Sequence, residues 1–501
     1  MPDVPLRVPG IRGERLPVSV PSLPPPAGNG HAVVDAVVVG AGPNGLAAAV
    51  ALAREGCRVV VLEADASIGG GARTEELTLP GFQHDVCSAV LPFGIGSPFL
   101  RTLPLADHGL EWVHPQTPLV HPLEGDAYAL ERSIEATAAG LAEDGPAWRS
   151  LFGPLADRWD ALADDALAPL HWPRRPGPLL RLAAGAARTA EGLAHARFST
   201  EPAQALFAGI AAHGIQPLSR RPTAAVALLL GAAAHAVGWP FARGGAGGVP
   251  AALASLLTSL GGEILTGREV TSLAELPPAR AVLLDVTPWQ LLRIAGPWLT
   301  PRYRRRLAAF RYGPGVFKVD WALDEPIPWR GEACRRAGTI HVVGSLPEIE
   351  ASERSVVEGR ASERPFVLVA QPSLFDPSRA PAGKHVAWAY CHVPNGWRGD
   401  ETAAIEARIE EFAPGFRERI LARSAKGPRE IEARNANCVG GDIAGGLMDL
   451  RQSFARPLSP VAPYATELGG VYLCSASTPP GPGIHGMCGY HAARAALRAM
   501  G

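Results

Sequence analysis

A glycine-rich turn between two short apolar runs constrains the fold of this chain more than any other feature. The run 35–39 is rich in β-branched residues, as buried parallel strands are. It enters a complete G-x-G-x-x-G over residues 40–45, after which we expect a helix over 46–55. A second apolar run over 58–62 ends in an acidic residue. Strand, turn, helix, strand and acid in this order are typical of a dinucleotide-binding βαβ unit.

The glycines and the acid have separate roles in such a unit. Gly40 permits the tight turn, Gly42 lets a pyrophosphate approach the backbone, and Gly45 lets the helix pack against the strand. The helix N-terminus offers unpaired N–H groups to phosphates, and Glu63 stands where a carboxylate binds the adenosine ribose. The expected nucleotide contacts are Gly40, Gly42, Pro43, Asn44, Gly45 and Glu63.

A second glycine cluster follows the acid. Residues 68–74 include Gly70, whose backbone brings further N–H groups to a pyrophosphate, and Arg73, which is expected to add a charge-assisted hydrogen bond. Glu63 alone does not distinguish NAD from FAD, and this second cluster favours FAD. The alternative is a flexible loop with a solvated arginine.

Composition limits the class of protein. Of 501 residues, 47% are hydrophobic and 19% charged, which fits a globular chain with a large interior. The formal net charge of −1 gives no electrostatic case for nucleic-acid binding. Seven scattered cysteines include no metal-binding spacing, so we expect no metal site and a reduced, cytoplasmic protein. The Pro-rich residues 1–30 lack the apolar core of a signal peptide and are interpreted as a flexible leader.

One uncharged stretch, 222–242, is long enough to cross a bilayer by length alone. Its glycines, its proline and its high alanine content favour a buried helix instead.

Three separated blocks carry a family resemblance. They are residues 37–74, residues 244–250 with the strand-like 261–264 that follows, and residues 471–486. In this order they resemble the phytoene desaturase-like branch of the FAD-dependent amine oxidase superfamily. The third block has Ser475, Ser477, Pro480 and Pro482 where that family usually has glycines.

The resemblance implies FAD as cofactor and further contacts outside the first motif. The backbone of Val270 is expected against the adenine, and Ser477 belongs to the flavin-binding block. A helix over 486–500 would begin near the flavin pyrimidine and stabilise the charge that develops there on reduction. His485, Gly486 and Met487 are the expected contacts at that end.

The predicted fold is α/β, with a Rossmann-like FAD-binding domain interleaved with an α+β substrate domain. We expect the FAD-binding domain over 31–115, 240–290 and 430–501, and the substrate domain over 116–239 and 291–429. Alternating runs over 316–321, 365–369 and 386–393 predict a mostly antiparallel sheet with one covered face. Helices from 130–235 would cap it and leave a substrate cavity beside the flavin.

The expected activity is removal of hydride from a hydrophobic substrate, for which an isoprenoid or carotenoid-like molecule is one candidate. Flavin chemistry needs little acid–base help from the protein, so no catalytic residue is assigned. His485 is a weak candidate for a base, with helix capping as the alternative. His84 is another, with a local hydrogen-bonded pair to Asp85 as the alternative. Cys488 is interpreted as a buried thiol rather than a covalent flavin attachment.

Other functions remain open at this stage. An FAD amine oxidase and a flavin-dependent isomerase are the enzymatic alternatives, and a prenyl or lipid carrier of the escort-protein type is the non-enzymatic one. The electron acceptor is unknown. A peripheral membrane contact is a further hypothesis, against the alternative of a solvated face. It rests on arginines interleaved with leucines, namely Arg174, Arg175, Arg181, Arg188 and Arg197 with Leu179, Leu180, Leu182 and Leu193.

Overall fold

The first strand of the glycine motif is the central strand of a five-stranded parallel sheet. The computed structural model describes residues 34–173, 175–454 and 456–501, so the expected leader over 1–30 lies outside the described residues. The strand order is β16-β10-β1-β2-β9, and each neighbouring pair is parallel. Their bounds are β1 Val34–Val39, β2 Val59–Leu62, β9 Glu263–Leu265, β10 Ala279–Leu284 and β16 Val471–Leu473.

Helix α1 (Pro43–Ala53) begins three residues before the expected start. Proline suits the first helical turn because its ring fixes a helical φ and its missing N–H is not needed there. Gly56 follows the helix with a φ of +81°, as the expected helix stop requires.

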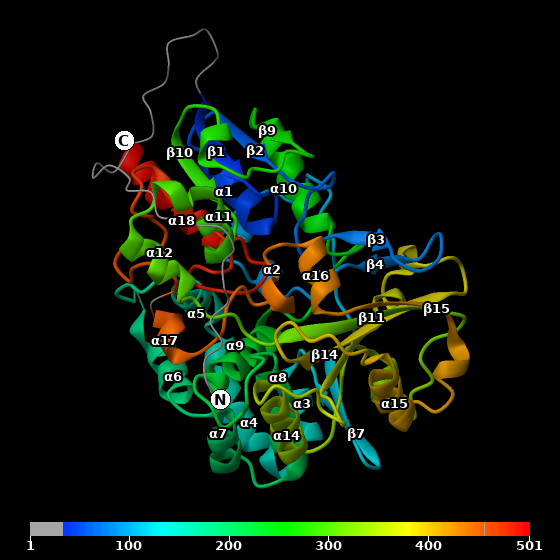
Figure 1. The fold of residues 1–501 in the computed structure, drawn as a ribbon. Coiled ribbons are helices and arrows are strands. Elements are labelled where there is room, and N and C mark those ends of the chain that lie inside the picture. The colour runs from blue at the N-terminus through cyan, green and yellow to red at the C-terminus, as the bar shows by residue number, and fades with distance from the viewer. Residues whose placement is uncertain (1–33, 174, 455) are drawn as a thin grey trace.

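Helices cover both faces of this sheet (Figure 1). On one face, α1 packs against α10 (Gly248–Ser259) and against α18 (Met487–Met500). A Cβ on Gly489 of α18 would collide with the Asn44 carbonyl, so glycine permits this close helix contact. On the other face lie α11 (Pro288–Ala295) and α12 (Pro301–Ala308). Leu260 lies just after α10 and is 39% exposed.

A seven-stranded sheet makes up the other half of the molecule, with the order β15-β11-β14-β13-β12-β6-β7. All of its pairs are antiparallel except β12 with β6. The bounds are β6 Thr117–Leu123, β7 Asp126–Leu130, β11 Gly315–Leu323, β12 Ala337–Val342, β13 Val367–Ala370, β14 His385–Val393 and β15 Ile420–Lys426. Two short pairs, β3 Thr74–Glu76 with β4 Gln83–Asp85 and β5 Trp112–Val113 with β8 Phe241–Ala242, complete the strands of the described residues.

The expectation of one covered face for this sheet was wrong. Every residue of β11, β12 and β13 is buried, as is nearly all of β14. One face packs against α15 (Thr402–Phe412) in a separate apolar core. The other is covered by helices that include α8 (Glu201–Ala212) and α14 (Leu346–Val357). Successive side chains of these strands therefore point into two different buried layers.

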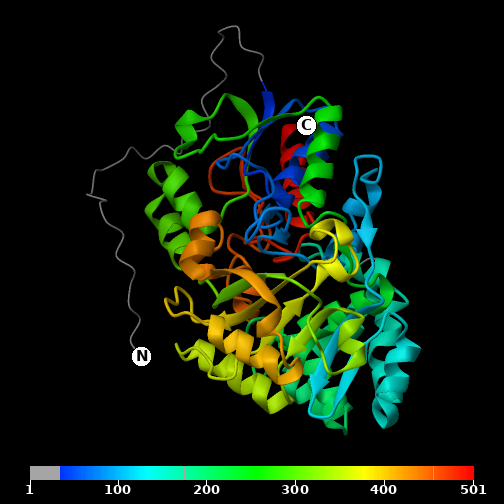
Figure 2. The same ribbon diagram turned by 90° about the vertical axis from the view of Figure 1, so that its right-hand side faces the viewer.

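The helices between the first and the second visit of the chain to the parallel sheet form a lower layer, seen from two sides in Figures 1 and 2. The other helices there are α3 Ile134–Gly140, α4 Gly145–Ala156, α5 Trp159–Ala166, α6 Pro176–Ala186, α7 Ala190–Arg197 and α9 Thr223–Ala236. The remaining helices are α2 Pro92–Ile95, α13 Glu332–Arg335, α16 Pro428–Arg434 and α17 Leu450–Phe454. Helix α9 is the uncharged stretch, and most of its residues are buried. Within the described part of the chain, no helix has the length and hydropathy needed to span a bilayer.

The predicted fold class is confirmed: a parallel Rossmann-like sheet and a separate mixed sheet share one α/β chain. The chain enters the parallel sheet at β1, returns at β9 and β10, and returns once more at β16. The domain boundaries given above stay a prediction.

Candidate cofactor groove and adjoining cavity

A groove lies at the carboxyl ends of β1, β10 and β16, where open α/β sheets bind their ligands. Its volume is about 140 Å³. Five segments line it, namely 42–44, 70–72, 285–287, 435–445 and 475–477, with Cys87, Ser88, Gly483 and Ile484. Gly42, Pro43, Asn44, Gly70 and Ser477, all expected from the sequence, are among them.

The glycines of the first motif make room at this site. A Cβ on Gly45 would collide with the Gly40 carbonyl oxygen, and one on Gly42 would lie 2.9 Å from Asp285 Oδ2. Gly70 has a φ of +55°, and a Cβ there would come within 3.2 Å of the Gly42 Cα. Two glycine turns thus approach each other more closely than residues with side chains would allow.

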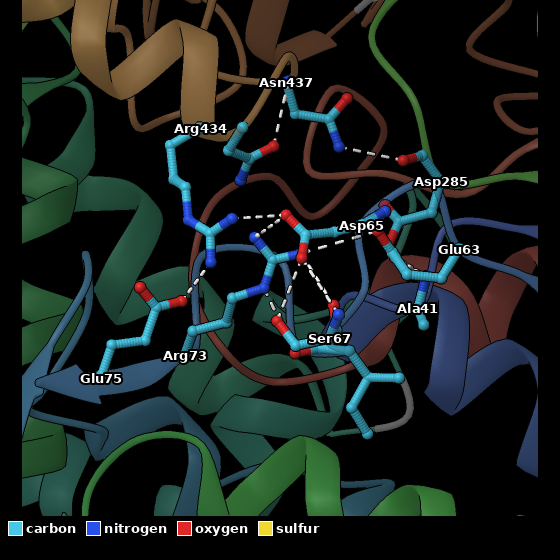
Figure 3. Close-up of polar contacts among 11 residues, drawn as sticks. Ala41, Glu63, Asp65, Ser67, Arg73, Glu75, Asp285, Arg434 and Asn437 are labelled. Atoms are coloured by element: carbon cyan, nitrogen blue, oxygen red, sulfur yellow. Dashed lines mark hydrogen bonds and ion pairs between the residues drawn. The ribbon is translucent and has the colours of Figure 1, made fainter. Parts of the chain in front are cut away.

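Glu63 follows β2 and is held rigidly (Figure 3). The Ala41 N–H donates to Glu63 Oε2 at 2.7 Å, and the Asp65 N–H donates to Oε1 at 2.9 Å. Only 8% of the residue is exposed. A carboxylate can accept more than two hydrogen bonds, so the fixed oxygens keep acceptor capacity for ribose hydroxyls.

Arg73 does not line the groove; its guanidinium lies against the neighbouring loop (Figure 3). Its Nη2 donates to the Ser67 carbonyl at 3.0 Å and lies 3.6 Å from Glu63 Oε1. Nη1 lies 3.5 Å from Asp65 Oδ2. Arg73 thus orders the loop that follows β2, and its expected hydrogen bond to a pyrophosphate stays a prediction.

A loop from a distant part of the chain closes the groove. Arg434, in α16, donates to Asp65 at 2.5 Å and also to Glu75. Asn437 Nδ2 donates to the Asp285 carbonyl at 2.9 Å, and Asn437 Oδ1 accepts the Thr287 N–H at 3.1 Å. No sequence motif marks this loop, so it was not predicted.

Asp285 is the least expected group in the groove. Its Oδ2 accepts the Gly45 N–H at 2.9 Å, at the N-terminus of α1. Burial, with Glu63 nearby, raises the pKa of Asp285 to about 7. At pH 7 such a carboxyl group is neutral in about half of the molecules, which eases the approach of an anionic ligand.

The C-terminal block contributes one wall and one buried turn. Ser477 Oγ donates to the Gly445 carbonyl at 2.7 Å within the groove wall. His485 is fully buried, and its Nδ1 accepts the N–H of Met487, the first residue of α18, at 3.0 Å. This contact is the helix cap considered above. Gly486 supports it with a φ of +68°. Burial lowers the pKa of His485 to about 4.

Cys488 matches the interpretation as a buried thiol. It is fully buried, and burial raises its pKa to about 12. Its sulfur lies 3.4 Å from the Gly481 carbonyl.

Two expected features lie away from the groove. Val270 packs with Leu62 and Leu265 in the core under the parallel sheet, beyond β9. The glycine-rich segment 244–248 lies under β3 and β4, where the Ala246 N–H donates to Asp85 Oδ1 at 2.7 Å. The adenine contact of Val270 stays a prediction.

His84 and Asp85 are not paired with each other. His84 Nε2 lies 2.8 Å from Thr78 Oγ1, and its Nδ1 lies 3.6 Å from Asp320 Oδ1. Asp85 Oδ2 accepts from Arg379 at 2.8 Å. Burial, followed by the positive charge of Lys318, lowers the pKa of His84 to about 3. Adjacent strand residues face opposite sides, which separates the two side chains.

A second cavity continues from the groove towards the seven-stranded sheet. It shares Gly70, Gly71, Cys87, Asn435, Cys438 and Ile443 with the groove. Lys318, Tyr390 and Lys426 line the side of the cavity away from the groove, and none of them was predicted from the sequence. The rarity of lysine could have drawn attention to Lys318 and Lys426, because the chain contains only three lysines.

The groove carries polar atoms suited to a dinucleotide. Asn44 Oδ1 and Thr287 Oγ1 are buried in the residues that line the groove, and Asn44 Oδ1 has no hydrogen-bond partner among the described residues. Together with the glycine turns and the fixed Glu63, these atoms fit the phosphates and hydroxyls of FAD.

Comparison with known proteins supports the same assignment. Residues 38–103 match the family model of an NAD(P)-binding Rossmann-like domain. The chain is 28% identical to pyridine nucleotide-disulfide oxidoreductase domain-containing protein 2 of Mus musculus, over 93% of both chains. It is 25% identical to all-trans-zeta-carotene desaturase of Myxococcus xanthus, over 91% of this chain and 92% of the desaturase.

This chain is an oxidoreductase, and its relatives over nearly the whole length include a carotene desaturase. The resemblance predicted from the three sequence blocks is thereby confirmed. A solved structure of putrescine oxidase bound to putrescine has the same fold, with a TM-score of 0.61 and 18% identity. That match covers 94% of this chain and 99% of the oxidase. In this chain, all three visits to the parallel sheet contribute residues to the groove.

Proposed function

We propose that this oxidoreductase binds FAD along the groove and removes hydride from a hydrophobic substrate held in the adjoining cavity. The observation that carries the proposal is the continuity of the two spaces, which share the Gly70–Gly71 turn and Asn435. FAD would supply the hydride-accepting chemistry, and the protein would supply binding, orientation and exclusion of water.

The residues that would hold the cofactor follow from their positions. Glu63 would accept from the ribose hydroxyls, since both of its oxygens are already fixed by backbone N–H groups. The N-terminus of α1, with Gly42 and Asn44, would face the phosphates. The N-terminus of α18 at Met487 would face the flavin pyrimidine.

The cavity walls support a hydrophobic substrate. Val86, Val316, Ile431 and Ile443 line the cavity and would exclude water from the reacting C–H bond. An isoprenoid or carotenoid-like molecule is one candidate, in keeping with the desaturase among the relatives. The electron acceptor stays open.

Two enzymatic alternatives and one carrier function compete with this proposal. An amine oxidase or an isomerase would use the same cofactor groove, and the solved oxidase structures support the fold without choosing among substrates. A lipid carrier would have no use for a cofactor groove. Anaerobic bleaching of the bound flavin by a substrate, with recovery on adding an acceptor, would favour a dehydrogenase or oxidase over the isomerase and the carrier.

The test is the flavin content of the purified protein, measured by absorption and after extraction. We expect about one FAD for each chain. Gly42→Val should abolish binding, because a larger side chain would fill the space beside Asp285. Glu63→Gln should weaken binding by about tenfold or more through loss of charge-assisted hydrogen bonds.

Gly140→Ala is a matched control, because a Cβ at Gly140 meets no atom within 4 Å. It should keep the flavin content of the wild type. A folded wild-type protein that stays colourless and does not take up added FAD would contradict the proposal.

We also propose a peripheral membrane contact around α6, through which a hydrophobic substrate would reach the enzyme. Leu170, Trp172 and Leu180 are 64%, 94% and 65% exposed, and Arg175 and Arg181 are exposed beside them. Exposed apolar side chains flanked by arginines favour an anionic lipid surface.

The contacting residues differ from those expected. Leu182 and Leu193 are buried in the core, and Leu179 is partly buried against it, so only Leu180 of the four expected leucines faces outward. Arg174 lies outside the described residues.

A further inference from the structure

A cavity of about 680 Å³ lies between α18, the end of α1 and the loop that follows α5. It shares no lining residue with the cofactor groove. Cavities that bind organic ligands measure about 300–1,000 Å³, so this one has room for a molecule the size of a mononucleotide. Most of its lining residues are polar or charged, which favours a polar ligand.

The carboxylates that line the cavity are all paired. Each of the three lies 2.9 Å from a nitrogen of an arginine or histidine side chain. The pairs are Glu55 with Arg494, Asp164 with Arg101, and Asp165 with His171. The negative charges of the cavity wall are therefore already engaged by neighbouring side chains.

Two further arginines line the cavity without such a partner. Among the residues that the structure describes, no carboxylate lies within 4.0 Å of the guanidinium of Arg54 or of Arg498. The hydrogen bond that Arg54 donates to Thr102 Oγ1 is long, at 3.5 Å. Both arginines are exposed, so a ligand from solution can reach them. The planar guanidinium, with several N–H donors, suits a phosphate group.

Helix α18 sets the distance between the two ends of a ligand in this cavity. Tyr490, Arg494 and Arg498 line it at intervals of four residues, so they share one side of the helix over about 12 Å. The Tyr490 ring stacks on the buried Phe99, with ring centroids 4.6 Å apart. A fixed aromatic ring therefore stands at one end of the row and an unpaired arginine at the other.

His491 contributes a polar atom beside this row. Burial lowers the pKa of His491 to about 4, and the charges of His171 and Arg498 act in the same direction. The histidine is therefore neutral at pH 7. Its Nε2 is buried and has no hydrogen-bond partner in the described part of the chain. This nitrogen is available to accept from a ligand hydroxyl.

We propose that this cavity binds a nucleoside phosphate, with the phosphate on Arg54 and Arg498 and the base against Tyr490. A ribose hydroxyl would donate to His491 Nε2 between them. Aromatic rings stack with planar bases, and paired arginines bind phosphate oxygens. The inference goes beyond the proposed function, because the site shares no residue with the groove proposed for FAD.

The test compares three probes: guanosine monophosphate, guanosine and inorganic phosphate. Their binding to the purified full-length protein is measured by titration calorimetry. We expect guanosine monophosphate to bind about tenfold or more tightly than either of the other two, because it alone reaches both ends of the cavity. Its binding should weaken as salt is added.

The double variant Arg54→Gln with Arg498→Gln should lower the affinity for guanosine monophosphate to about that for guanosine. Tyr490→Leu should weaken binding of both nucleosides severalfold and leave phosphate binding unchanged. Arg398→Gln is the matched control, since Arg398 is exposed in the loop after β14, and it should not change any of the affinities. Thermal unfolding of each variant establishes that it folds.

Equal affinity for guanosine monophosphate and guanosine in the wild type would overturn the inference, as would an unchanged preference in the folded double variant. Gly42→Val, which obstructs the cofactor groove, should bind guanosine monophosphate as the wild type does. Loss of that binding in folded Gly42→Val would place the nucleotide in the groove and also overturn the inference. The proposed function is tested by flavin content, on which these titrations do not depend.

Discussion

We expect Asp285 to make the stability of the fold depend on the protonation of one buried carboxyl group. Its Oδ2 accepts the Gly45 N–H in the part of the groove where the phosphates of FAD are proposed to lie. Burial raises its pKa from 3.8 to about 7, so the folded state holds a proton that the unfolded state releases between these values. Stability from this proton is complete below pH 3.8 and is lost as pH rises through about 7.

Asp285→Asn should therefore stabilise the protein increasingly as pH rises. Asparagine keeps the acceptor for the Gly45 N–H but cannot ionise. The gain over the wild type should grow by up to about 1.4 kcal/mol for each pH unit in this range. Urea unfolding at pH 5 and pH 8 measures the gain.

Asp107→Asn serves as the control, because Asp107 is exposed on the surface. Its effect should be the same at both pH values. A gain for Asp285→Asn that is equal at pH 5 and pH 8 would contradict the assignment of a raised pKa.

Single residues were predicted well only where a local motif marked them. Gly42, Asn44 and Gly70 line the groove as expected, because the spacing of the glycines encodes the turn itself. Asp285 and Asn437 escaped prediction, because their roles depend on contacts between segments about 150 residues apart. Lys318 and Lys426 meet only through the register of a sheet that no sequence pattern specifies.

At the scale of elements, the surface around α6 gives the clearest test of membrane contact. Trp172, in the loop before α6, is 94% exposed, and Leu180 in its second turn is 65% exposed. We expect the protein to float with anionic liposomes at low salt and to be released at high salt. Trp172→Ala with Leu180→Ser should reduce the bound fraction severalfold, because both apolar contacts are lost.

Leu421→Ser is the control, since Leu421 is 47% exposed on β15 and lies outside this surface. It should not change flotation. Absence of lipid binding by the wild type at low salt would refute the proposal.

Elements with a strong period were predicted closely. β1, β2, α18 and the strands β11, β13 and β14 occur where the apolar pattern placed them. The prediction that only one face of the seven-stranded sheet is covered was wrong. The alternation of residues along a strand does not reveal whether the second face meets solvent or other helices.

At the scale of the whole molecule, buried histidines should make the protein acid-sensitive. His213 Nε2 lies 3.0 Å from His341 Nε2 between the seven-stranded sheet and α8, close to His121. Burial lowers the pKa of His213 to about 3 and that of His121 to about 4. The pKa of His341 is lowered well below 6.5, with burial as the main cause.

Unfolded histidines take up protons below pH 6.5, whereas these folded ones do not until the pH is far lower. Stability is therefore complete above pH 6.5 and lost as pH falls. Each histidine contributes up to about 1.4 kcal/mol per pH unit. Burial also raises the pKa values of Asp285, Asp320 and Asp442, which act in the opposite direction, but the buried histidines with lowered pKa values outnumber them.

Urea unfolding at pH 7.5 and pH 5 should show a lower free energy of unfolding at pH 5. His213→Asn should reduce the difference by about one histidine's contribution. His195→Asn, at an exposed position of α7, should not change it. Equal free energies of unfolding at the two pH values in the wild type would contradict this prediction.

The order of the chain also has a consequence for biosynthesis. The parallel sheet takes its outer strand β16, and the helix α18 that packs against α1, from residues 471–500. A nascent polypeptide still tethered to the ribosome holds the earlier strands but lacks the wall that Ser475 and Ser477 supply. We therefore expect the proposed cofactor to bind only after residues 471–477 have left the ribosome, and a premature stop before residue 471 would leave a product without a complete groove.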